Sequence, residues 1–164
     1  MKRGRAGNMV LETALFIPVL LLLIVGMVQI GKTTYLYYTL KKILYAAARD
    51  VGVQEGINFC DVTDDATAQA ALNFALTDPN TGNPIVSGLT ALTVTASCTD
   101  PNNPAGALIP CDTSNCSSLN IAQQPNFLTV SISGGYQVNI RIPFISPIPV
   151  TLNPSVTVPF EGVS

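Results

Sequence analysis

The hydrophobic pattern divides the chain into one long N-terminal helix and a later region of short alternating strands. Residues 10–51 are predicted to form a single helix, which at about 1.5 Å per residue would be about 63 Å long. Its first half is apolar on all sides, as expected of a membrane span. Its second half is amphipathic, and Gly52 and Gly56 are predicted to end it. The apolar positions that recur at helical spacing in this second half are Leu36, Leu40, Ile43, Ala47 and Val51.

A second, shorter helix is predicted after an acidic pair. Asp64 and Asp65 are suitable N-capping residues, because an aspartate side chain accepts hydrogen bonds from the free N–H groups of a first turn. The residues expected on the buried face are Ala68, Ala71, Leu72, Ala75 and Leu76. Residues 77–90 and 99–126 are rich in Pro, Asn, Thr and Gly, which predicts loops.

The C-terminal part alternates apolar and polar residues with a period of two, which predicts strands. The alternating segments are 92–97, 128–133 and 136–142, and a last strand is predicted near 156–160. Gly134-Gly135 lies between two of them and predicts a β-hairpin. Several prolines place the terminal segments at sheet edges or in loops; they are Pro143, Pro147, Pro149, Pro154 and Pro159. A one-faced antiparallel sheet needs a cover, which the amphipathic half of the long helix supplies, so the fold class is α+β.

Composition agrees with a surface that is not wholly exposed to water. The chain has 164 residues, 48% hydrophobic and 11% charged, whereas a soluble domain is about 25% charged. Its net charge is −2, so it has no basic footprint for nucleic acid. It has no His, which removes the commonest general base and metal ligand. We therefore expect no cofactor, no catalytic residues and no metal site.

Four cysteines lie beyond the apolar segment, at Cys60, Cys98, Cys111 and Cys116. An even number in a loop-rich, exported region favours disulfides. Three connectivities are possible, and we favour Cys111–Cys116 with Cys60–Cys98. Zinc binding is the alternative, but the chain has neither a C-x-x-C pair nor a His.

The N-terminus combines a short basic segment, an isolated carboxylate and an apolar run. Lys2, Arg3 and Arg5 precede Gly7, and Glu12 stands immediately before the 19 uncharged residues 13–31. An acid at the centre of a membrane helix costs about 2.5–3.5 kcal/mol, so Glu12 at the edge of the run calls for a compensating charge. Cutting after Gly7 would supply one, the new amino terminus of Asn8. The basic residues also predict a cytoplasmic N-terminus, with the rest of the chain outside the cytoplasm.

This segment resembles the N-terminus of the TadE-like pilins of the tight-adherence (Tad) pilus system, which belong to the type IV pilin class. The shared elements are Gly7 before the cut, Glu12 at the fifth mature position and Pro18 six residues later. The run Tyr45 to Gly52 is also similar to the end of that family's helix. The resemblance covers about the first 52 residues.

The resemblance implies a domain organisation and a set of partners. Residues 1–7 would be a leader, 8–52 the long helix with its transmembrane half, and 53–164 an extracytoplasmic domain. A prepilin peptidase would cut the Gly7–Asn8 bond, and Glu12 would pair with the amino group of a neighbouring subunit. Other partners would be further copies or related pilins, the inner-membrane assembly platform and, before assembly, the membrane itself. The product would be a cell-surface filament that serves adhesion, and the chain's length leans toward a minor subunit.

Pro18 itself is expected to disturb the helix. Proline has no N–H, so the bond to the carbonyl of Ala14 is lost, and a kink or a loosened turn is predicted there.

Three other patterns have simpler explanations. Gly26 to Thr33 matches G-x-x-x-x-G-K-[ST], but it lies inside a predicted helix, so helix packing and a snorkelling Lys32 explain it better than nucleotide binding. A group of tyrosines follows the apolar run, and an interfacial belt or packing between helices explains it better than electron conduction. The aspartates at 61, 64 and 65 lack the spacing of an EF-hand calcium loop.

The sequence therefore predicts a structural, pilin-like subunit. The rival is a single-span anchored envelope protein with an extracytoplasmic binding domain, which shares the topology but does not need Glu12.

Overall fold

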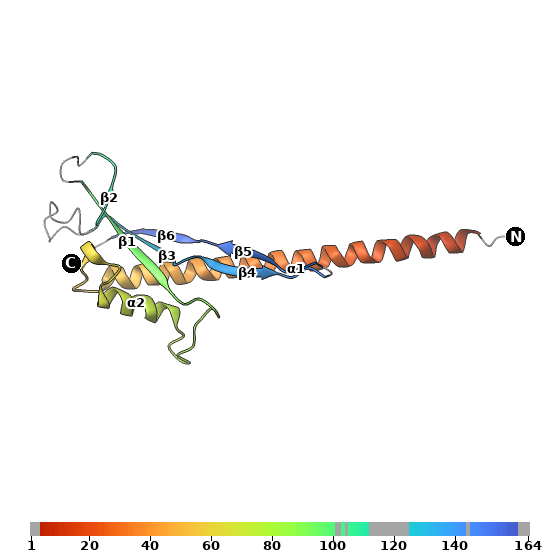
Figure 1. Cartoon of the computed structure of the whole chain (residues 1–164), viewed down its shortest axis with the longest axis horizontal. Helices are drawn as coiled ribbons and strands as arrows, with labels where there is room; N and C mark the ends of the chain where they lie inside the picture. Colours follow the sequence, from red (N-terminus) through yellow and green to blue (C-terminus); the bar gives the residue numbers. More distant parts are fainter. Residues whose placement is uncertain (1–3, 101–102, 104, 112–124, 144, 161–164) are drawn as a thin grey trace. The chain divides into compact units, whose positions relative to one another are not determined.

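The computed structural model describes residues 4–100, 103, 105–111, 125–143 and 145–160 (Figure 1). Its helices are α1 (Gly4–Val53), the short 3-10 helix η1 (Phe59–Asp61) and α2 (Ala66–Leu76). Its strands are β1 (Leu92–Cys98), β2 (Ile109–Pro110), β3 (Phe127–Ile132), β4 (Tyr136–Ile140), β5 (Ile148–Leu152) and β6 (Ser155–Pro159). This confirms the α+β class.

The chain divides into two compact units that share α1. We call Tyr37–Tyr136 with Leu152–Ser164 the helix–sheet unit, and Met1–Leu36 with Gln137–Thr151 the helix–hairpin unit. Each is described by itself.

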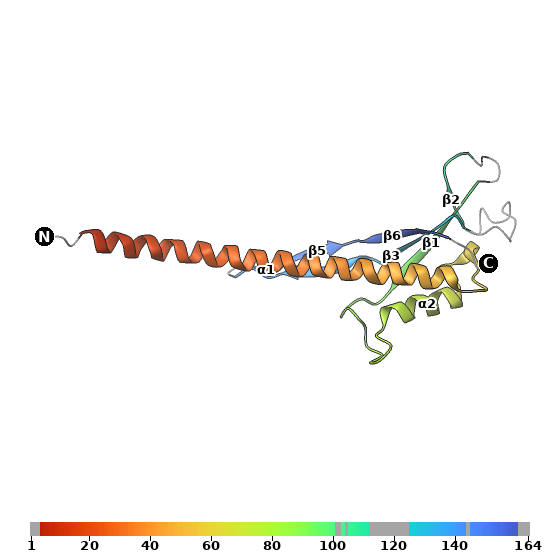
Figure 2. The ribbon, with the colours of Figure 1, turned by 180° about the vertical axis from the view of Figure 1, so that it is seen from behind.

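The core of the helix–sheet unit is built on one stripe of α1. The buried positions recur at helical spacing and are Leu40, Ile43, Leu44, Ala47, Ala48 and Val51. This confirms the predicted amphipathic half and adds Leu44 and Ala48 to it, while Leu36 is only half-buried. Helix α2 runs beside this part of α1 in both views (Figures 1 and 2). The five residues predicted for the buried face of α2 are all buried.

Strands β1 and β3 supply the opposite side of this core. Their buried side chains pair across the antiparallel ladder, Leu92 with Ile132, Val94 with Val130 and Ala96 with Leu128. The strand order is β2-β1-β3-β6, which leaves the proline-bounded β6 at an edge, as predicted. On the other face polar side chains meet, and the hydroxyls of Thr129 and Thr157 lie 2.8 Å apart.

The predicted hairpin across Gly134-Gly135 is wrong in its pairing. A turn does form, since both glycines have positive φ and the Gly135 N–H donates to the carbonyl of Ile132. However, β3 pairs with β1 and β6, whereas β4 pairs with β5, a strand that the prolines hid. With a strand on each side, β3 buries Leu128 and Val130 completely, so tertiary burial outweighs the local turn signal.

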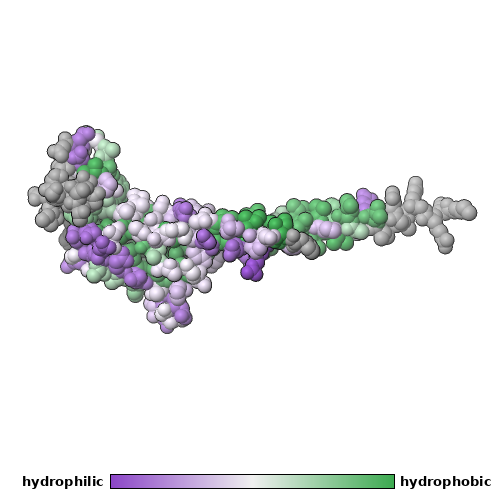
Figure 3. Space-filling model, viewed as in Figure 1, coloured by the Kyte–Doolittle hydropathy of each residue, from purple (hydrophilic) through white to green (hydrophobic). Residues whose placement is uncertain are grey.

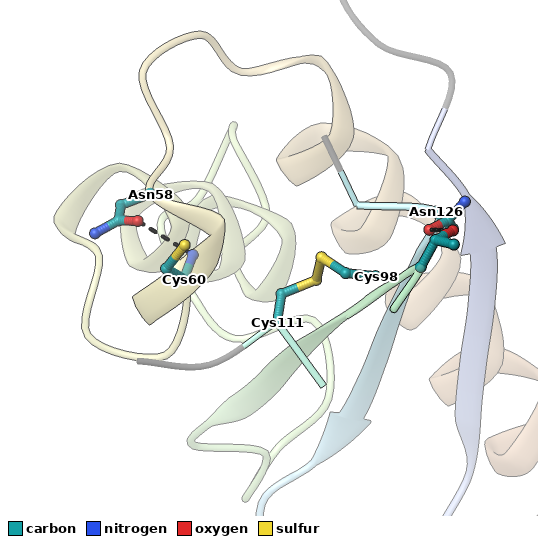
Figure 4. Close-up of a disulfide and its surroundings, with 6 residues drawn as sticks. Asn58, Cys60, Cys98, Cys111 and Asn126 are labelled. Atoms are coloured by element: carbon teal, nitrogen blue, oxygen red, sulfur yellow. Dashed lines mark hydrogen bonds between the residues drawn. A yellow bond between two sulfur atoms is a disulfide. The ribbon is translucent and has the colours of Figure 1, made fainter. Parts of the chain in front are cut away.

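The favoured disulfide pairing is also wrong. Cys98 is bonded to Cys111, with 5.4 Å between their Cα atoms (Figure 4). Strand β2 causes this pairing, because it aligns Cys98 opposite Ile109 and brings the Cys111 N–H to the carbonyl of Ala96. Cys60 is disulfide-bonded as well, and Cys116 lies outside the described residues.

Asp65 is the capping residue of α2, and its carboxylate joins the first turn of α2 to the segment before η1. One carboxylate oxygen accepts from the Ala68 N–H at 2.9 Å, and the other accepts from the Asn58 N–H at 3.1 Å. These hydrogen bonds, that of Ala68 first, favour the ionised form and lower the pKa of Asp65. Asp64 does not cap the helix.

We expect Asp65→Ala to lower the free energy of unfolding by about 0.5–2 kcal/mol at neutral pH, the usual cost of losing an N-cap. Because the folded-state pKa is depressed, the ionic part of this stabilisation is present above the unfolded pKa of about 3.9 and is lost as pH falls through the folded pKa. Asp65→Asn keeps a capping oxygen without the titration. Denaturant unfolding of the full chain in neutral detergent measures the difference in free energy of unfolding between Asp65→Asn and wild type. This difference should close below pH about 4. A gap that is constant with pH would contradict the assignment.

Gly52 and Gly56 should respond to alanine in opposite ways. The prediction that Gly52 ends the helix is wrong, because α1 continues through it to Val53. A Cβ at Gly52 would lie 3.7 Å from Leu128 Cδ1, an ordinary contact, so Gly52→Ala should raise the free energy of unfolding by up to about 1 kcal/mol. Gly56 has φ +84°, so Gly56→Ala should lower it by about 1–2 kcal/mol. The unfolding midpoints of the two variants check this: relative to wild type, the midpoint of Gly52→Ala should rise and that of Gly56→Ala should fall.

Candidate assembly helix

The residues predicted for processing and assembly all lie on the N-terminal part of α1. Gly7 and Asn8 are near its start, and Glu12 and Pro18 follow in the same continuous helix. Glu12 is exposed, and so is Pro18, which α1 passes without ending. The kink predicted at Pro18 stays a prediction. Lys2 and Arg3 lie outside the described residues.

The apolar half of α1 has no cover from Leu11 to Ile24 within the described chain. Its large side chains from Leu11 to Ile24 are 45–76% exposed. The space-filling view shows this apolar surface along the helix (Figure 3). Among the described residues, α1 is the one helix long and apolar enough to cross a membrane, judged by length and composition. Such a surface requires lipid or another protein around it.

A partial cover begins only at Val25. The half-buried positions Val25, Gly26, Gln29 and Thr33 fall on one side of α1. On this side the Gln29 side-chain amide donates to the backbone carbonyl of Arg141 at 2.9 Å. The β4–β5 hairpin therefore lies against the end of the apolar half, within the helix–hairpin unit (Figures 1 and 2).

Sequence reasoning missed this contact. The available signal was Gln29 itself, an amide inside an uncharged run, since an amide taken out of water needs a hydrogen-bond partner. Its partner is a main-chain carbonyl 112 residues away, which no periodicity reveals.

The nucleotide-loop pattern lies in uninterrupted helix. Residues 26–33 belong to α1, and the Thr33 hydroxyl donates to the carbonyl of Gln29, one turn earlier. A phosphate-binding loop needs a strand before it and free N–H groups, which this backbone does not offer. A Cβ at Gly26 or Gly31 would meet nothing within 4 Å among the described residues, so no close contact described there requires a glycine at either position.

The tyrosines after the apolar run are mostly exposed. Tyr35, Tyr38 and Tyr45 are 57–76% exposed. Tyr37 and Tyr38 meet edge to face with their ring centroids 6.2 Å apart, and the Lys41 ammonium lies 5.4 Å from the Tyr37 centroid. The row suits an interfacial belt or contacts between helices.

The acidic residues near α2 form no metal site in the described part of the chain. No group of three or more His, Cys, Asp or Glu side chains there is placed to hold an ion. Asp65 is occupied as a helix cap.

Comparison with known proteins adds the deciding observation for this helix. Residues 7–49 match the family model of the TadE-like proteins. The match begins at Gly7 and ends within α1, so it confirms the resemblance over about a quarter of the chain. No curated protein and no solved structure matches the chain.

The TadE-like match indicates a protein associated with the Tad pilus system. The TadE-like family is a structural one, associated with the pilus system. The apolar half of α1 and the TadE-like match together fit anchoring in a membrane.

Proposed function

We propose that the protein is a pilin-like structural subunit, held in the inner membrane by α1 and then assembled into an extracellular filament. The observation that carries this proposal is the uncovered apolar surface of a TadE-like helix from Leu11 to Ile24. Before assembly the bilayer covers this surface, and in the filament neighbouring helices cover it. Membrane insertion and polymerisation thus use the same side chains, and no separate adhesive patch is needed to hold subunits together.

Processing after Gly7 would prepare the subunit for assembly. The leader carries Lys2, Arg3 and Arg5, and its removal by a prepilin peptidase would leave an amino group on Asn8. That group would pair with Glu12 of a neighbouring subunit, since an isolated carboxylate in an apolar surrounding is costly until it is paired. Further copies or related pilins and the assembly platform are the proposed partners.

The helix–sheet unit would form the outer surface of the filament and serve adhesion. Its charged and polar side chains lie outside a closed core, and a disulfide ties β1 to the segment after β2. Such a crosslink suits an oxidising compartment outside the cytoplasm.

Mass spectrometry of filaments sheared from cells tests the proposal. The subunit should be present in the filament fraction, and its N-terminal peptide should begin at Asn8. A subunit that still begins at Met1 in assembled material would refute cleavage. Absence from filaments, with the protein retained in the membrane fraction, would favour the single-span envelope protein instead.

A further inference from the structure

The turn that closes the β4–β5 hairpin presents apolar side chains to its surroundings. We call residues 141–143 and 145–148 the apolar turn. Ile145 is 57% exposed and Ile148 is 46% exposed. Arg141 is the only charged residue from 134 to 160 in the sequence. A segment with exposed isoleucines and one charge is typical of a surface that meets lipid or protein.

The hairpin is held at a defined level of α1. The uncharged run 13–31 is about 28 Å long at 1.5 Å per residue, close to the roughly 30 Å of a hydrocarbon core. Gln29, which bonds the Arg141 carbonyl, lies about 3 Å inside the end of this run, and half-buried Val25 lies about 9 Å inside it. Whatever surrounds this part of α1 therefore also surrounds the hairpin.

We propose that the apolar turn inserts into the outer leaflet of the membrane beside α1, as a second and shallower contact with the bilayer. This inference rests on the proposed topology, in which α1 spans the membrane before assembly. Two contacts instead of one would also limit rotation of α1 about its own axis.

The backbone of the turn suits this position, because a bilayer leaves free N–H groups unsatisfied. Pro143 and Pro147 in the turn, and Pro149 directly after it, have no N–H to satisfy. The Ile145 N–H donates to the carbonyl of Ile142 at 3.2 Å. The turn thus carries fewer free donors than a loop of ordinary composition.

The side chains of the hairpin are arranged for an interface between apolar and polar surroundings. Val138, Ile140 and Val150 are half-buried, whereas Gln137 and Asn139 are exposed. Exposed Arg141 stands where β4 has just ended, beside the end of the uncharged run of α1. A guanidinium at that level can reach lipid phosphates while its stem lies along apolar surface.

A single tryptophan reports the depth of the turn, because the chain has no Trp of its own. We would place it at Ile145, or at Ile148 as a second variant of the turn. Leu21→Trp is the control for the span, and Phe74→Trp, at a 63% exposed position of α2, is the control for water. Each full-length variant is reconstituted in phosphatidylcholine and phosphatidylglycerol vesicles, with and without lipids brominated on their acyl chains.

We expect Ile145→Trp and Ile148→Trp to lose most of their emission to the brominated lipids, as Leu21→Trp does, while Phe74→Trp keeps its emission. Quenching of Leu21→Trp without quenching of either turn variant would overturn the inference and leave the span intact. No quenching of Leu21→Trp would refute the span itself. A turn variant that is unquenched and shifts its emission only as protein density rises would assign the turn to a second copy instead, and so also overturn the inference.

Discussion

Glu12→Ala is expected to abolish filament assembly while leaving the protein in the membrane. The carboxylate stands at the edge of an uncharged run and is exposed, so it is open to a partner from another subunit. In a filament it would lie among apolar helices, where an unpaired amino group opposite is strongly unfavourable. Removing one partner of a buried ion pair costs about 3–5 kcal/mol, and this cost would recur at every subunit contact.

Insertion should survive the same change, because an acid within a membrane helix costs free energy and alanine does not. Filaments sheared from cells and the membrane fraction are therefore measured together, by immunoblotting and electron microscopy. Glu55→Ala is the matched control, since it removes an exposed acid just beyond the end of α1. Glu12→Gln separates charge from hydrogen bonding and should also fail to assemble. Normal filaments that contain the Glu12→Ala protein would refute the pairing role of Glu12.

Leu128→Ala is expected to lower the free energy of unfolding by about 2–5 kcal/mol, a large share of the roughly 5–15 kcal/mol that a domain possesses. Leu128 is fully buried on the central strand β3. It pairs with Ala96 across the ladder, and its Cδ1 lies near Gly52 of α1, so its loss leaves a cavity between sheet and helix. Neither neighbour carries a side chain large enough to fill it.

Denaturant unfolding of the full chain in neutral detergent, followed by near-ultraviolet circular dichroism, measures this effect. Leu108→Ala is the matched control, because it makes the same change at a 43% exposed position and should cost about 0.5 kcal/mol or less. Equal costs for the two variants would contradict the assigned core. Together with Glu12→Ala the experiment separates folding from assembly: we expect Leu128→Ala to act on the helix–sheet unit and Glu12→Ala to act on contacts between subunits.

Features that depend on neighbours in sequence were predictable. The period of the apolar residues gave the amphipathic part of α1 and the face of α2, because a helix buries every third or fourth residue wherever its partner comes from. Alternation gave β1 and β3, and an aspartate before an apolar run gave the cap at Asp65. The Gly7–Glu12–Pro18 pattern needed no structure either, since its chemistry lies within a dozen residues of one helix.

Features that depend on distant partners were not predictable. β5 was missed because Pro149 argued against a strand, although an edge position tolerates it. β2 has two residues, too few for any period, and yet it sets the Cys98–Cys111 bond.

The sequence by itself thus determined the long helix, its apolar half, the isolated carboxylate and the class of the domain that follows. Only the tertiary structure decided which strand pairs with β3, which cysteine meets Cys98, and that Gln29 holds Arg141 beside the apolar run. The physical reason is that a local pattern states which side chains must be buried but not what buries them. Several partners satisfy the same alternation, and the packing of the whole chain selects one.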